Sequence, residues 1–213
     1  MTAPGPGYRT VLLDDLEEVP WKDARLTYRP LRGQLGISAF GAAAFTAAHA
    51  GDEVVEPHAE SPDGRGQQEL YFVARGRATF TLAGEQLDAP TGTFVFVEDP
   101  TVLRAAVAAE PDTAVLVFGG DPAAFTPAGE EYIARVRAAL GEDDPGRARA
   151  LAEAGRRELP DSPGVAYALA LAAAASGDDA EAGRRLAEAV DRVPELAGEA
   201  RTDAVLARLI DAG

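Results

Sequence analysis

The apolar residues of this 213-residue chain follow two different periods, and the change falls near residues 122–129. Before it, short β-branched and aromatic runs are separated by Gly, Pro and Asp about every ten residues, which is typical of an all-β sandwich or barrel. After it, Ala, Leu, Arg and Glu recur at spacings of three and four, which is typical of helices. The pattern therefore predicts an all-β domain over residues 30–125 and an all-α domain over residues 126–213.

The first domain is expected to contain a series of short strands. They lie at residues 68–74, 78–82, 94–97, 101–108 and 114–118. Glycine turns such as those at Gly76 and Gly84 separate them. One or two further strands are expected over residues 36–48, and a short helix or turn over residues 30–35. Residues 1–29 are expected to form an N-terminal arm that Trp21 attaches to the domain.

The second domain is expected to contain helices with a repeat. They lie at residues 129–140, 145–158, 163–175, 179–192 and 198–211. Pro160 and Pro194, which follow similar segments, are 34 residues apart. A helix–turn–helix period of 34 residues is the signature of tetratricopeptide repeats. The alternative is an alanine-rich bundle with a chance period. A stack of two repeats and a final helix would need the barrel or a partner protein to cover its faces.

Charge and composition argue against several classes of function. The formal net charge is −15, so phosphate backbones and anionic membranes would be repelled overall. The chain has no cysteine, which excludes disulfides, thiolate nucleophiles and Cys-liganded metals. No signal peptide is apparent, and the longest apolar run, residues 165–175, is about half of what a bilayer needs. We expect a cytoplasmic protein, of bacterial composition, that binds neither nucleic acid nor membrane.

Residues 30–120 carry the spacings of two short motifs. The residues are Gly51, Glu69 and Gly76 in the first, with His58 and Glu60 at or beside its ligand positions and an enlarged loop before Glu69, and Gly84, Pro90 and Gly92 in the second. This part of the chain resembles the cupin superfamily, and the whole layout resembles a group of bacterial proteins in which one cupin domain precedes a tetratricopeptide-like tail. The resemblance implies a jelly-roll (cupin) barrel.

The resemblance also implies a metal site, but most of its ligands are missing. Metal-dependent cupins hold their ion with three histidines and one glutamate, whereas this chain has only His49 and His58. Val95 stands where the second motif has a histidine, and a hydrocarbon side chain cannot coordinate a metal. We therefore expect no cofactor. The alternative is a reduced site of His58, Glu60 and Glu69 that binds a divalent transition metal weakly.

The cupin resemblance places Glu69 inside the barrel, where period-two alternation would add Tyr71 and Val73 to the same face. A carboxylate inside must be hydrogen-bonded, paired or neutral, so Glu69 is either a pocket residue or half of a structural pair with an arginine. His58 is expected near the pocket mouth and Val95 on the opposite wall. The predicted pocket consists of His58, Glu60, Glu69, Tyr71 and Val95.

Other polar residues are expected to have structural or surface roles. His49 lies beside a turn outside the motif. Arg75, Arg77 and Arg104 are interpreted as surface charges, with anion binding as the alternative. Gln67 and Gln68 are interpreted as solvated residues that could instead supply neutral hydrogen-bonding groups.

These observations predict a cupin-type small-molecule-binding or assembly protein with a degenerate metal site and a helical tail that binds a protein partner. The alternative is a cupin enzyme, either metal-dependent or a metal-free isomerase or cyclase. His58 and Glu69 are its candidate catalytic residues, as acid and base. Whether the chain is an enzyme stays open, and the ligand is not identified. A homodimer is expected because cupins often pair through their sheets.

Overall fold

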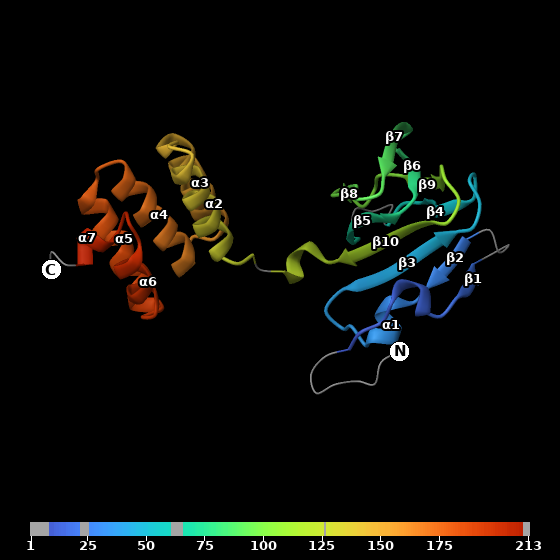
Figure 1. Cartoon of the computed structure of the whole chain (residues 1–213), viewed down its shortest axis with the longest axis horizontal. Helices are drawn as coiled ribbons and strands as arrows, with labels where there is room; N and C mark the ends of the chain where they lie inside the picture. Colours follow the sequence, from blue (N-terminus) through green and yellow to red (C-terminus); the bar gives the residue numbers. More distant parts are fainter. Residues whose placement is uncertain (1–8, 22–25, 61–65, 126, 211–213) are drawn as a thin grey trace. The chain divides into compact units, whose positions relative to one another are not determined.

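The computed structural model describes residues 9–21, 26–60, 66–125 and 127–210 of the chain. The chain divides into two compact units, Met1–Phe125 and Thr126–Gly213 (Figure 1). Each unit has a hydrophobic core of its own. In the described part, no helix combines the length and the apolar character that a membrane crossing requires.

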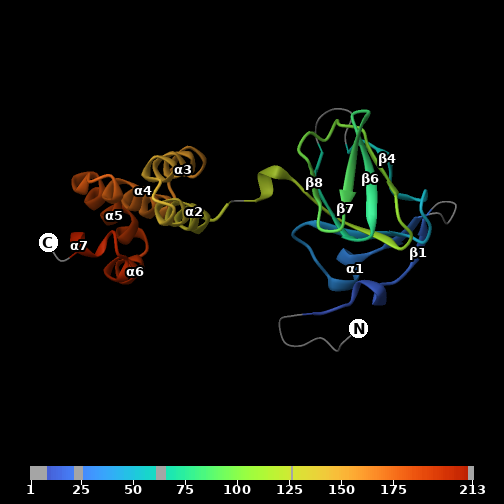
Figure 2. The same ribbon diagram turned by 45° about the horizontal axis from the view of Figure 1, so that its top comes forward.

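The first unit, called the β unit below, consists of two antiparallel sheets that can be followed in Figures 1 and 2. The larger sheet has the order β1 (Val19–Trp21), β2 (Leu26–Arg29), β3 (Gly41–Ala47), β10 (Thr113–Gly120), β5 (Gln68–Arg75) and β8 (Phe94–Val97). The smaller sheet has the order β4 (Glu53–His58), β9 (Arg104–Ala108), β6 (Arg77–Leu82) and β7 (Glu85–Pro90). Helix α1 (Leu31–Leu35) joins β2 to β3, and 3₁₀ helices lie at Leu13–Asp15 and Pro122–Ala124.

The inner faces of the two sheets pack against each other and form one core. In β5 the predicted alternation is confirmed, because Glu69, Tyr71 and Val73 are buried while the residues between them are partly exposed. Tyr71 meets Phe80 of the smaller sheet edge to face, with ring centroids 5.6 Å apart. Such aromatic pairs add about 0.5–1.5 kcal/mol beyond the burial of their area. The chain passes from β5 to β6 through Gly76, where a Cβ would lie 2.9 Å from the Thr113 Cα.

The N-terminal segment is more than an arm. Strands β1 and β2 extend the larger sheet, with β2 paired to β3. Arg29 is buried and donates to the carbonyl oxygens of Leu13 and Leu16, at 3.3 and 3.0 Å. The expected attachment by Trp21 is present, since its indole N–H donates to Glu56 of β4 at 3.2 Å. The boundary placed at residue 29 therefore cuts through a sheet.

Two further strands, β4 and β7, were not predicted. The segment of β4 contains Pro57 and two glutamates, which hide its apolar pattern. Strand β7 is an edge strand, and only Ala89 of its six residues is buried. An edge strand whose two faces are both exposed to solvent lacks the alternation of apolar and polar residues by which strands are recognised in a sequence.

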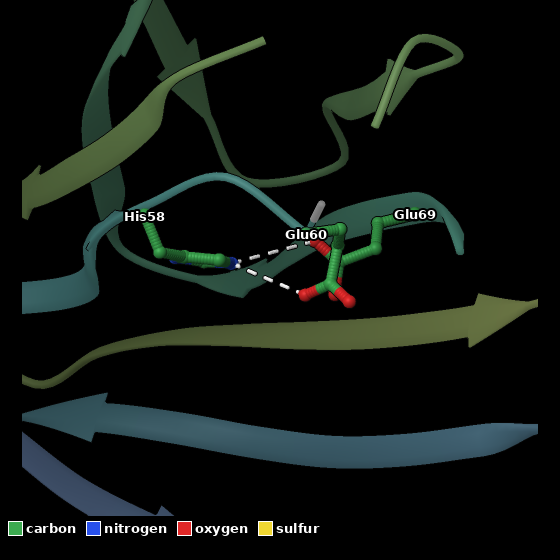
Figure 3. Close-up of side chains that lie close together, drawn as sticks. All are labelled: His58, Glu60 and Glu69. Carbon is green, nitrogen blue, oxygen red and sulfur yellow. Dashed lines mark ion pairs between the residues drawn. The ribbon is translucent and has the colours of Figure 1, made fainter. Parts of the chain in front are cut away.

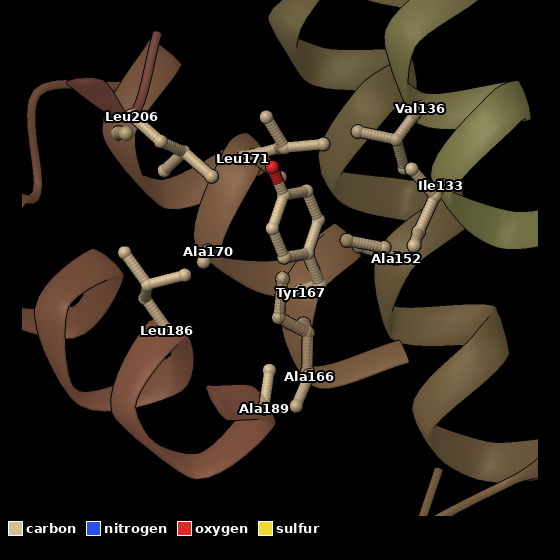
Figure 4. Close-up of a cluster of buried hydrophobic side chains, with 14 of the residues drawn as sticks. Ile133, Val136, Ala152, Ala166, Tyr167, Ala170, Leu171, Leu186, Ala189 and Leu206 are labelled. Atoms are coloured by element: carbon tan, nitrogen blue, oxygen red, sulfur yellow. The ribbon is translucent and has the colours of Figure 1, made fainter. Parts of the chain in front are cut away.

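The second unit, called the helical unit below, consists of α2 (Glu130–Gly141), α3 (Pro145–Glu158), α4 (Pro163–Ala175), α5 (Asp179–Arg192), α6 (Leu196–Thr202) and α7 (Ala207–Ile210). Helix α4 is almost entirely buried and lies against α2, α3 and α5. Tyr167 of α4 is fully buried at the centre of this core (Figure 4).

The helix starts follow the sequence closely, while the last helix differs from the prediction. Asp144, Ser162 and Asp178 each accept a hydrogen bond from a backbone N–H of the following turn, which makes them N-caps. The single helix expected over residues 198–211 is instead split into α6 and α7. Asp203 between them has an extended backbone and accepts a bond from the Val205 N–H at 2.9 Å, so its side chain competes with helix continuation.

The separate cores predict that the two units fold independently. Fragment 1–125 should keep its β-type circular dichroism and the fluorescence of the chain's one tryptophan, Trp21. Fragment 126–213 should be helical and should unfold at a lower denaturant concentration, because a short helical stack has few interfaces. The sum of the two spectra should reproduce that of the full chain. An unfolded fragment 1–125 would contradict the division into units.

Candidate functional site

Three side chains with metal-binding or acid-base chemistry meet inside the β unit (Figure 3). His58 ends β4, Glu60 lies in the segment that follows it, and Glu69 is the second residue of β5. The His58 Nε2 lies 3.6 Å from the Glu60 Oε1 and 3.7 Å from the Glu69 Oε2. The three residues of the predicted reduced site are therefore neighbours in space.

The position of His58 depends on an irregular strand. The register of β4 against β9 shifts twice between Glu53 and His58, and Val54 and Val55 are both buried although they are adjacent. Such irregularities re-aim side chains at the end of a strand. The His58 Nδ1 donates to the Glu56 carbonyl oxygen at 2.7 Å, which leaves Nε2 directed at the carboxylates. The neighbouring Glu69 carboxylate raises the pKa of His58 against the opposing effect of burial.

Glu69 is a buried carboxylate with several partners. Its Oε2 accepts hydrogen bonds from the Tyr71 hydroxyl and from Nη1 of Arg104, the latter at 2.9 Å. Burial by itself would raise the pKa of Glu69, but the bonds from His58 and Tyr71 and the charge of Arg104 outweigh it, and the pKa is lowered. Glu69 is therefore ionised. Burial and the neighbouring carboxylate raise the pKa of Tyr71, so its hydroxyl keeps its proton.

Arg104 is the residue that the sequence interpretation placed wrongly. It begins β9 and is fully buried, not a surface charge. Its Nη2 donates to the Pro100 carbonyl oxygen at 3.2 Å, while its Nε is buried without a hydrogen-bond partner among the described residues. Strand β9 places Arg104 beside His58 across the smaller sheet, while Glu69 comes from the larger sheet. The ion pair therefore bridges the two layers of the sandwich.

The position expected for Val95 also needs correction. Val95 is buried, but it is the direct cross-strand neighbour of Tyr71 on β8, in the same sheet, not on an opposite wall. His49 is exposed and lies 3.3 Å from Asp52, away from the site. Arg75 is exposed and Arg77 is half-buried, and both form ion pairs at the surface, as interpreted from the sequence.

The three donors suit a metal ion by type and spacing but not by charge. One imidazole and two carboxylates, with ligand atoms within 4.8 Å of one another, match sites for manganese, iron or zinc. Arg104 already donates to the same Glu69 oxygen at 2.9 Å, and a guanidinium keeps its proton. Two unit positive charges 4 Å apart repel by about 4 kcal/mol at an effective dielectric of 20, and a divalent ion doubles this figure. Arg104 therefore opposes a metal ion at this oxygen by its charge and competes with it for the Glu69 carboxylate.

A cavity of about 200 Å³ opens next to Glu69, at the end of the larger sheet. It is lined by Tyr28, Arg32, Gly41, Ala42, Ala43, Gln67, Glu69, Val117 and Gly119. Gly41 and Gly119 face each other across β3 and β10, and a Cβ on Gly119 would lie 2.5 Å from the Gln67 Oε1. Small residues at these positions leave the space and let the Gln67 side chain lie over the strands.

Of the pocket residues expected from the sequence, Glu69 lines this cavity. Gln67 is exposed, as interpreted from the sequence, and it also lines this cavity as a neutral polar group. Tyr28 and Arg32 were missed as cavity residues. Tyr28 falls in the segment interpreted as an N-terminal arm, and Arg32 in the short helix or turn expected after it. The glycines at the ends of β3 and β10 were the available signal, since glycine inside a strand often marks a close approach.

No family model and no curated protein matches the chain. Among solved structures, KdgF from Halomonas sp. is 18% identical with a TM-score of 0.42, covering 53% of this chain and 94% of its own. A cupin protein from Bacteroides fragilis is 18% identical with a TM-score of 0.43, covering 58% and 92%. An RmlC-like cupin from Desulfovibrio desulfuricans is 22% identical with a TM-score of 0.40, covering 53% and 97%. Similarity at this level carries no argument about what the chain binds or does.

The buried ion pair predicts a large and specific loss of stability. Arg104→Met leaves the buried Glu69 charge without its main partner and should lower the free energy of unfolding of the β unit by about 3–5 kcal/mol. Glu69→Gln in the same chain should restore part of the loss. Urea denaturation followed by the fluorescence of Trp21 reports on this unit.

The matched control is Arg75→Met, which removes an exposed ion pair with Asp14 and should cost about 0–1 kcal/mol. Equal losses for the two arginines would contradict the prediction. If Arg104→Met does not fold, a folded Glu69→Gln/Arg104→Met chain leads to the same conclusion.

Proposed function

We propose that the β unit is a cupin-type jelly roll that binds a small molecule without a resident metal. The observation that carries the proposal is the fully buried Arg104, bonded to Glu69 at 2.9 Å. It puts a permanent positive charge beside the carboxylate around which a metal site would be built.

The jelly-roll assignment is supported by the motif residues and by the sheets that they join. The four motif glycines are Gly51, Gly76, Gly84 and Gly92, and all have positive φ. Glycine adopts this backbone conformation without the strain that a Cβ atom would cause. Two antiparallel sheets packed face to face are the layers that a jelly roll requires.

Binding is favoured over acid-base catalysis by the position of the cavity. The raised pKa of His58 would suit a proton donor, but the His58 Nε2 faces Glu60 and Glu69. The cavity is instead lined by Glu69, Gln67, Tyr28 and Arg32, which are groups that bind and orient. A few polar groups in a small concave site are the usual composition of a ligand pocket.

The absence of a resident metal is tested on full-length protein purified without a histidine tag. Elemental analysis should find well under one equivalent of transition metal. Because Arg104 is proposed to exclude the ion by charge, Zn²⁺ or Mn²⁺ should raise the melting temperature of Arg104→Met more than that of the unaltered chain. The matched control, Glu69→Gln/Arg104→Met, should lose the response. Near-stoichiometric metal in the unaltered protein, lost on His58→Ala, would overturn the proposal.

For the helical unit we propose a tetratricopeptide-like stack. Its support is the 34-residue spacing of Pro160 and Pro194 together with consecutive helices that pack against their neighbours around α4. The low stability expected of fragment 126–213 tests the short stack. A protein partner of this unit stays a prediction, and no surface is assigned to it.

A second candidate function, assembly, is favoured by one surface of the β unit. On the outer face of β8, Phe94 and Phe96 are 64% and 56% exposed. They begin two cross-strand rows that continue over β5 and β10. The rows are Phe94, Phe72 and Leu116, and Phe96, Leu70 and Phe118. An apolar exposed area of this kind usually marks an interaction site.

We propose that a second copy of the chain covers this face. The six residues carry no charge, so two chains of net charge −15 can approach there with the least repulsion. Strand β8 is also the outermost strand of its sheet, so both rows reach the edge, and a twofold axis through this face would bring the rows of the two chains into contact.

The dimer predicts a mass change that sedimentation equilibrium can measure. The unaltered chain should sediment as a dimer, and Phe94→Ser/Phe96→Ser should shift it to the monomer. Leu87→Ser is the matched control, because Leu87 is an exposed apolar residue of the other sheet. An unaltered chain that stays monomeric at about 100 μM, or an equal effect of the control, would exclude this interface.

A further inference from the structure

We propose that the cavity beside Glu69 binds a small hydroxy-carboxylic acid of about three to six carbons, with its carboxylate on Arg32 and a hydroxyl group on Glu69. This inference rests on the proposed small-molecule-binding function and names its ligand class. The supporting observations are the size of the cavity, the unpaired charge of Arg32 and the neutralised charge of Glu69.

The volume suits a small molecule. A cavity of about 150 Å³ in a protein core admits a molecule of the size of benzene. The cavity here, of about 200 Å³, therefore holds a ligand of about six to ten non-hydrogen atoms. Its walls at Gly41, Gly119 and Val117 leave room for a short carbon chain, while the polar groups come from other elements.

Arg32 is an exposed cation for which the described residues provide no anion. Within the described ranges, its one hydrogen bond goes to the Ile37 carbonyl oxygen at 3.4 Å, and it forms no ion pair. Most of the chain's arginines that the structure describes are paired with carboxylates, as expected for a net charge of −15. A guanidinium that is left unpaired at a cavity presents the planar donor geometry that suits a carboxylate.

Glu69 is proposed to bind the hydroxyl end of the ligand. Its Oε2 is engaged by Tyr71 and Arg104, whereas its Oε1 has no hydrogen-bond partner in the described part of the chain. A carboxylate oxygen accepts hydrogen bonds, so the ligand must offer a donor there. An ionised carboxylate has no hydrogen to donate and cannot satisfy this oxygen, which directs the ligand's acid group to Arg32.

The donor is expected to be a hydroxyl and not an ammonium group. Arg104 already balances the charge of Glu69 at 2.9 Å. An additional cation from an amino acid would therefore lie close to the positively charged guanidinium of Arg104, whereas a neutral hydroxyl adds no charge. The same argument that disfavours a divalent metal thus selects hydroxy acids over amino acids. Gln67 and Tyr28 can bond further hydroxyl groups.

The experiment compares matched ligands by saturation-transfer NMR and titration on the full-length chain. Glycerate and erythronate carry both groups, glycerol and erythritol lack the acid, and propionate and butyrate lack the hydroxyls. At least one hydroxy acid should bind about tenfold or more tightly than both of its counterparts. Arg32→Gln should weaken that acid about tenfold or more and leave the binding of the polyol unchanged.

Arg157→Gln is the matched control, because Arg157 is an exposed arginine of α3 for which the described part of the chain provides no ion pair. It should leave all affinities unchanged. Equal binding of acid and polyol, or equal effects of the two substitutions, would overturn the ligand class but leave small-molecule binding standing. Tighter binding of alanine or serine than of lactate or glycerate would overturn the choice of a hydroxyl. No binding of any hydroxy acid at 10 mM, while a neutral sugar binds, would also reject the inference.

Discussion

The buried pair of Arg104 and Glu69 is the interaction on which the β unit's site depends. Arg104 comes from β9 of the smaller sheet and Glu69 from β5 of the larger one, so the pair connects the two layers through their apolar core. Two opposite charges in such a place need each other, because either one alone would carry a desolvation cost of several kcal/mol. Buried pairs of this kind are often no more stabilising than hydrophobic replacements of similar volume.

The pair also determines what its neighbours can do. It keeps Glu69 ionised in spite of burial. The Glu69 carboxylate in turn raises the pKa of His58 and the pKa of the Tyr71 hydroxyl, which therefore stays protonated. Because the positive charge is part of the chain, the cluster that resembles half of a metal site already has its cation. The site is then better suited to accept a neutral donor from a ligand than to hold a second cation. This connects the missing histidines of the motif with the chemistry that remains.

The helical unit is held together by a different kind of constraint, the close packing of small residues. A Cβ on Gly164 would lie 2.8 Å from the backbone of Gly129, and one on Gly155 would lie 2.8 Å from the Tyr132 ring. These contacts let α2 approach α4 and α3, and the buried Tyr167 fills the space that the alanines leave. Arg137 covers the Tyr167 ring at 5.6 Å and binds Asp203 at 3.1 Å, which ties α2 to the turn between α6 and α7.

Local patterns in the sequence determined much of this protein. The change of period separates sheets from helices, the alternation in β5 puts Glu69 inside, and the proline and aspartate caps begin the helices. Tertiary structure decided what these patterns cannot contain. The partner of Glu69 is Arg104, which is 35 residues away on another sheet. The sequence of a strand that begins with arginine does not show whether that end of the strand is exposed to solvent or buried by other elements. Arg32 and Tyr28 became cavity residues only because β2 joined the larger sheet beside β3. Pairing across sheets is settled by the register and packing of whole strands, and a single segment carries no record of either.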